Sequence, residues 1–279
     1  MKWTSVLSIL AIIIGNTNVA MGQGSGPYPA SWFEEPSLAN HTIYMPESPP
    51  DNMSLPVLVW GNGACENNGI RFMNLLTNIA SYGFIVLASG PPEGTGSTNV
   101  QMLRDSVSWA LESAGSEGKY LTVDASKIAV AGQSCGGLEA YHLRDDDRVS
   151  FLGIFNSGFL PQDPGGGLGV SVPWEDPTTI EEVHKPVFYF LGGPSDIAYT
   201  NGRDDYEGLT GVPKWMGNYP VGHFGTYSEP DGGAFGVAAV HWLLWTLSKR
   251  MDGAEFFTDG GAEAAGWETE SHGLESLLQ

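Results

Sequence analysis

The sequence predicts an α/β fold: one domain built on a mostly parallel sheet, with helices on both faces. Apolar runs rich in β-branched residues alternate with helical stretches from about residue 55 to 250, which is typical of buried parallel strands joined by helices. The composition agrees, because 42% of the residues are hydrophobic and 16% are charged, a balance that supports a sizeable core. No internal repeat or second core interrupts this pattern.

Five short apolar runs are the predicted strands, and four stretches with helical character lie between or after them. The strands are residues 57–60, 84–89, 127–131, 151–156 and 186–191. The helices are residues 72–80, 100–112, 138–143 and 235–248, the last of which is predicted to be the final helix.

The first 22 residues have the pattern of a secretory signal peptide. Lys2 supplies a positive start, residues 6–14 form an apolar stretch, and Ala20, Met21 and Gly22 resemble a cleavage site. The sequence therefore predicts a secreted protein with a domain over residues 23–257. An uncleaved membrane anchor is the alternative, although so short an apolar run does not span a bilayer comfortably.

Charge and local composition add three expectations. The formal net charge of −20 argues against nucleic acid or anionic membrane as a partner. Asn40 and Asn52 begin sequons that predict N-glycosylation in a secretory pathway. The acidic tail, residues 258–279, is expected to be weakly ordered apart from an anchor at Trp267.

Residues 132–136 read Gly-Gln-Ser-Cys-Gly, a Gly-x-Ser-x-Gly match centred on Ser134. In a chain with 38 glycines the match alone says little. Its context is more specific, because the strand at 127–131 runs into it and a helix leaves it, as in the nucleophile elbow of α/β-hydrolases. We therefore expect Ser134 to be a nucleophile; the alternative is a structural serine in a glycine-rich turn.

A serine nucleophile needs a histidine base and an acid that orients it, and in this fold both come after the serine, the acid first. The histidines after Ser134 that leave room for an acid are His184, His223, His241 and His272. His223 is the predicted base, because it lies in a loop just before the predicted last helix. A surface or packing role is its alternative.

Asp196 is the predicted acid, since it lies on a turn just beyond the strand at 186–191. Its rivals Asp204, Asp205 and Glu207 come after a turn at 201–202 and are expected at the exposed start of a helix.

An oxyanion would need two backbone N–H donors. Cys135, the residue after the nucleophile, is expected to supply one. The glycine-rich turn at 61–65 is expected to supply the other, from Ala64 or, as second choice, Gly63. An ordinary glycine turn is the alternative.

Four segments together resemble a family of secreted fungal α/β-hydrolases: residues 60–63, 131–137, 196–199 and 222–227. The family is similar to dienelactone hydrolases, chlorophyllases and polyester hydrolases of the cutinase-like kind, and the resemblance covers most of residues 40–257. It implies hydrolysis of carboxylic esters without a metal or organic cofactor. The glycine- and proline-rich segment 161–177 falls where such folds carry a cap, and its length predicts a loop, hence a minimal cap. The tail after Phe257 departs from the family because it is acidic and lacks cysteines.

Cys65 and Cys135 are the only cysteines, and both adjoin the expected oxyanion donors. In this fold the strands leading to the two turns are neighbours about 5 Å apart, so a disulfide fits. The alternative is two free, buried thiols.

The leading functional prediction is a serine esterase acting on small or polymeric esters. Acyl transfer or lactone chemistry in secondary metabolism would use the same residues. A secreted binding or effector protein that kept the fold without turnover is a third interpretation.

Overall fold

The computed structural model describes residues 23–160 and 179–278. The predicted signal peptide, residues 1–22, and the predicted loop at 161–177 lie outside the described residues, so both stay predictions. No helix in the described ranges is long and apolar enough to cross a membrane. Asn40 and Asn52 are both exposed, while their glycosylation stays a prediction.

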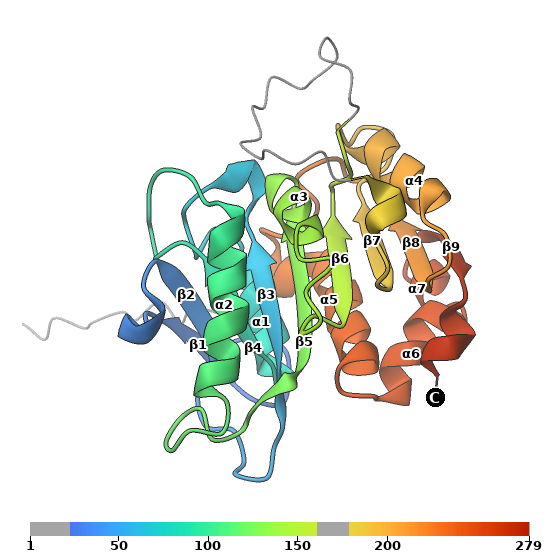
Figure 1. The fold of residues 1–279 in the computed structure, drawn as a ribbon. Helices are drawn as coiled ribbons and strands as arrows, with labels where there is room; N and C mark the ends of the chain where they lie inside the picture. The colour runs from blue at the N-terminus through green and yellow to red at the C-terminus, as the bar shows by residue number, and fades with distance from the viewer. Residues whose placement is uncertain (1–22, 161–178, 279) are drawn as a thin grey trace, which may run out of the picture.

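A nine-stranded sheet in the order β1-β2-β4-β3-β5-β6-β7-β8-β9 forms the centre of the described residues (Figure 1). The six central strands, β4, β3, β5, β6, β7 and β8, are parallel to one another. Strands β1, β2 and β9 are antiparallel to their neighbours. The predicted α/β class is confirmed. The strands are β1 (Ala30–Phe33), β2 (His41–Pro46), β3 (Leu55–Gly61), β4 (Ile85–Ser89), β5 (Val123–Gln133), β6 (Phe151–Phe155), β7 (Val187–Leu191), β8 (Lys214–Asn218) and β9 (Glu268–His272).

Helices cover both faces of the sheet, as Figure 1 shows. The principal helices are α1 (Met73–Ser81), α2 (Val100–Ser113), α3 (Cys135–Tyr141), α4 (Tyr199–Gly208), α5 (Gly233–Thr246) and α6 (Met251–Thr258). Along β3, Leu58 and Trp60 pack in one core cluster with α1, α5 and α6, whereas Val57 and Val59 pack in the other with α2, α3 and α4. The alternation results from the period of two in a strand. Burial on both faces explains why these strands are almost continuously apolar.

All five predicted strands and all four predicted helices are present, with ends that shift by a few residues. The expectation that residues 235–248 form the final helix was wrong, because α6 and a short α7 (Gly261–Ala264) come after α5. Strands β1, β2, β8 and β9 lay outside the prediction.

The expectation of a weakly ordered tail was also wrong for the described residues 258–278. Strand β9 pairs along its whole length with β8, and Trp267 is buried against Tyr219 and Phe235. An edge strand needs only backbone pairing on one side, so most β9 side chains point to solvent and can be acidic. The expected anchor at Trp267 was therefore right, but it holds an ordered segment.

Strands β3, β5, β6, β7 and β8 run parallel, so their carboxyl ends meet at one edge of the sheet. The loops at these ends carry every residue predicted for the site. Ligands of open α/β sheets bind at this edge.

Candidate active site

Ser134 occupies a sharp turn between β5 and α3. Its backbone has φ 54° and ψ −118°, a conformation that costs an L-residue free energy and persists only where the surroundings enforce it. Two glycines permit the turn. A Cβ on Gly136 would lie 2.1 Å from the backbone of Gly61, and one on Gly132 would lie 2.3 Å from the backbone of Gly136. The glycines flanking Ser134 are therefore required by close backbone packing.

His223 links the predicted nucleophile to the predicted acid. The Ser134 hydroxyl lies 3.0 Å from its Nε2, and its Nδ1 lies 2.6 Å from the Asp196 carboxylate. The histidine is carried by the loop after β8, which is fixed by a Gly222 N–H that donates to the Gly192 carbonyl over 2.7 Å. The side chain of Gln133 also donates to the His223 carbonyl. Ser134 and Asp196, which lie 89 and 27 residues before His223 in the chain, are thus joined through it by hydrogen bonds.

Asp196 is a fully buried carboxylate that has four hydrogen-bond partners in the described part of the chain. Besides His223, its oxygens accept from the N–H groups of Ala198 and Gly192, at 2.9 and 3.1 Å, and from the Asn156 side chain at 2.8 Å. Burial raises the pKa of this carboxyl, but the hydrogen bonds outweigh burial and hold the pKa below its ordinary value. The group is therefore an anion at neutral pH, as an orienting acid must be.

The rival carboxylates lie on α4. Asp204 and Glu207 are exposed as expected, but the expectation was wrong for Asp205. The helix begins at Tyr199, which turns Asp205 inward, where it accepts from the hydroxyl of Tyr141 over 2.8 Å. Burial raises the pKa of Asp205 to about 7.

The two expected oxyanion donors line one pocket with Ser134 and His223. Ala64 comes from the turn after β3, and Cys135 begins α3, where first-turn amides have no acceptor within the helix. The remaining lining is mainly apolar and includes Leu138, Leu160, Ile197 and Ala198. The structure thus brings the predicted site residues together around one pocket; their chemical roles stay predictions.

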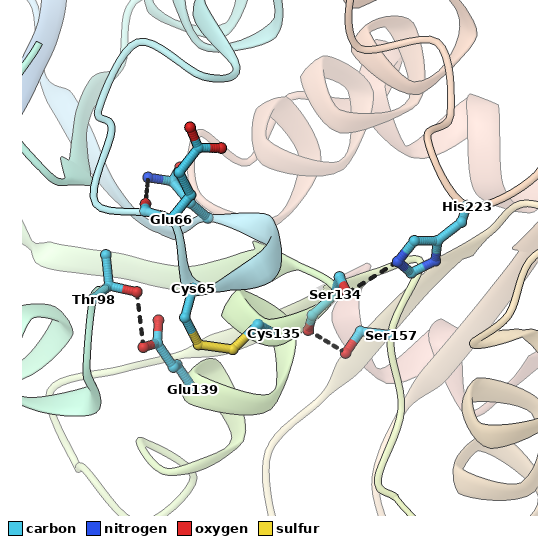
Figure 2. The surroundings of a disulfide bond; sticks show 9 residues. Cys65, Glu66, Thr98, Ser134, Cys135, Glu139, Ser157 and His223 are labelled. Carbon is cyan, nitrogen blue, oxygen red and sulfur yellow. Dashed lines mark hydrogen bonds between the residues drawn. A yellow bond between two sulfur atoms is a disulfide. The ribbon is translucent and has the colours of Figure 1, made fainter. Parts of the chain in front are cut away.

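Cys65 and Cys135 form a disulfide, with Cα atoms 5.2 Å apart (Figure 2). The predicted bond is confirmed, and the alternative of two free thiols is wrong. It joins the turn after β3 to the start of α3, on the side of Ser134 away from His223. The Thr98 N–H also donates to the Cys65 carbonyl over 2.7 Å. The turn is thus fixed from both sides.

Glu139 is a fully buried carboxyl that sequence reasoning missed. Figure 2 shows it on α3 beside the disulfide, where Thr98 donates to its Oε1 over 3.0 Å. Its Oε2 has no hydrogen-bond partner in the described part of the chain. Burial raises the pKa of Glu139 to about 7, against the opposing effect of the Thr98 hydrogen bond.

Four residues around the site share a positive φ angle. Ala64, Cys65, Ser134 and Asn156 all have positive φ, between 43° and 54°, although none is glycine. Such residues concentrate at functional sites.

The described ranges contain no group of three or more His, Cys, Asp or Glu side chains placed to hold a metal ion. No protein-family model matches the chain, and no curated protein matches it.

Proposed function

We propose that this protein is a serine hydrolase of the α/β-hydrolase fold that cleaves carboxylic esters. One observation carries the proposal: Ser134, His223 and Asp196 form a continuous hydrogen-bonded line at the carboxyl edge of the sheet. The strained turn at Ser134 and the start of α3 directly after it support the same function, because a nucleophile elbow has this form.

In the proposed reaction, the Ser134 oxygen attacks the ester carbonyl carbon while His223 Nε2 takes the hydroxyl proton. The N–H groups of Ala64 and Cys135 hold the resulting oxyanion. Collapse breaks the bond to the alcohol, which leaves with the proton from His223. Water, deprotonated by His223, then attacks the acyl-enzyme and releases the acid, and Ser134 regains its proton.

The pocket supports an ester with an apolar acyl group. Next to Ser134 it is walled by Leu138, Leu160 and Ile197, and the described residues that line it include no Asp, Glu, Lys or Arg side chain. A charged acyl group would lose hydration there without gaining an ionic partner.

A fluorophosphonate probe tests the proposal, because it reacts covalently with activated serines. We expect labelling of the wild type, loss of labelling in Ser134→Ala, and full labelling in Ser150→Ala, which alters an exposed serine. A panel of p-nitrophenyl esters should be hydrolysed in the same pattern. A folded wild type that neither reacts with the probe nor hydrolyses any ester would instead favour a binding protein.

A further inference from the structure

Asn156 lies where the acid and histidine loops meet. It comes directly after β6, it is fully buried, and its φ is 43°. Its backbone N–H donates to the Phe190 carbonyl of β7 over 2.8 Å. The backbone position of Asn156 is therefore fixed by the sheet itself.

The side-chain amide of Asn156 contacts the Asp196 carboxylate and the backbone of the loop that carries His223. Its Nδ2 donates to Asp196 Oδ2 over 2.8 Å and to the Gly222 carbonyl over 3.3 Å. Gly222 immediately precedes His223. One amide nitrogen thus links the carboxylate to the loop that carries the histidine.

Tyr227 determines which end of this amide faces the carboxylate. Its buried hydroxyl donates to Asn156 Oδ1, and its ring packs between Phe72 and Phe235. Burial raises the pKa of Tyr227 far above its ordinary value, so the hydroxyl keeps its proton. A flipped amide would place oxygen against the Asp196 carboxylate, with no donor between them.

We propose that Asn156, oriented by Tyr227, is a positioning residue that keeps Asp196 in line with His223 during the reaction. The inference rests on the proposed function for its effect on turnover. In the described residues Asn156 is the one side chain besides His223 that donates to the Asp196 carboxylate. When His223 takes the serine proton, the carboxylate must stay anionic and aligned, and a hydrogen bond to the anion favours both.

The test is Asn156→Leu, which keeps the branched shape of the side chain and removes the donor. We expect kcat to fall about 10- to 100-fold, as for a lost buried hydrogen bond to a charged group, with KM changed less than about 2-fold. The loss of activity at low pH should also begin at a higher pH. The pKa of Asp196 rises when a donor to its anion is lost, and a protonated Asp196 no longer serves as the anion that orients His223. Tyr227→Phe should change kcat and the pH profile in the same direction, to a smaller extent.

Asn74→Leu is the matched control, because it removes a half-exposed amide that donates to the carbonyls of Ser228 and Glu229, and none of these three residues lines the pocket. It should leave kcat and the pH profile unchanged. If Asn156→Leu keeps wild-type kcat and pH dependence, the inference is overturned. If that variant does not fold, Tyr227→Phe decides by the same two measurements.

Proton NMR separates failure of the inference from failure of the proposed function. The His223 Nδ1–H that donates to Asp196 should give a downfield resonance that does not depend on turnover. We expect Asn156→Leu or Tyr227→Phe to shift or broaden it. A wild type inactive towards the probe would sink the proposed function, whereas an unchanged resonance in both variants would sink the positioning role alone.

Discussion

Glu139 is a carboxyl group that the fold buries beside a disulfide with only one hydrogen-bond donor, Thr98, among the described residues. Its pKa of about 7 is above the ordinary value of 4.5. The native state therefore binds a proton that the unfolded state releases between these two pH values. The contribution of this group to stability is fully present below about pH 4.5 and is lost as the pH rises through about 7.

Glu139→Gln should remove this pH dependence while keeping the shape of the side chain. Between pH 4.5 and 8 we expect the wild type to lose up to about 3 kcal/mol of unfolding free energy relative to the variant. Urea unfolding at several pH values measures the difference. Both proteins should keep a residual slope from Asp205, whose pKa is also about 7. Parallel stability curves for the two proteins would contradict the assignment.

At the residue scale, the sequence allowed prediction of the features that obey a general rule. The strand, turn and helix around Ser134, and the order of acid and histidine after it, narrowed the candidates to Asp196 and His223, which the structure joins by a hydrogen bond. Asn156 and Glu139 obey no such rule. A polar residue directly after a buried strand was the available signal for Asn156, but its partners lie 40 and 71 residues away.

At the scale of elements, the disulfide joins the turn after β3 to the first residue of α3, two segments that the sheet only brings near each other. It spans 70 residues, and a cross-link of that length stabilises the native state by roughly 4 kcal/mol in the chain-entropy account. The double variant Cys65→Ser, Cys135→Ser should lose about this much unfolding free energy. It keeps the backbone N–H of residue 135, so kcat should fall by at most about 100-fold through loss of order at Ala64.

Thermal melting with and without reductant checks this prediction. Reductant should lower the melting temperature of the wild type and leave that of the double variant unchanged. A double variant as stable as the oxidised wild type would show that the bond adds nothing to the stability that packing already gives the turn and α3.

The elements that the sequence predicted are those buried on both faces. Strand β7 is a continuous apolar run and β4 is one up to its last residue, Ser89. By contrast, β8 contains Lys214, Gly217 and Asn218, and every residue of β9 is polar. Pairing with a neighbour creates these last two strands, and pairing leaves little trace in hydrophobic patterning.

At the scale of the whole molecule, the C-terminal segment completes the sheet on the side of His223 and Asp196. Trp267 is 3% exposed and packs against Phe190, Trp215, Tyr219 and Phe235. Two of these residues belong to β7 and β8, the strands whose ends carry the predicted acid and base. Segment 258–278 therefore packs against the two strands that position Asp196 and His223.

Trp267→Ala should cost about 3 to 5 kcal/mol of unfolding free energy, because it removes a large buried side chain. Leu278→Ala, which alters a 41% exposed residue of the same segment, should change stability by less than about 0.5 kcal/mol. Urea unfolding of both variants provides the comparison. Equal stability of the Trp267 variant and the wild type would show that packing of this segment against the core does not stabilise the protein.

The four positive φ values around the site carry a consequence for how this protein can change. Each such conformation costs about 1 to 3 kcal/mol in a residue other than glycine, and Ala64 is a position where glycine would relieve the cost and still offer the same backbone N–H. Selection for heat resistance alone would therefore favour glycine there, and with it a looser turn beside Ser134. At Ala64, selection for thermostability and selection for turnover are therefore expected to favour different residues.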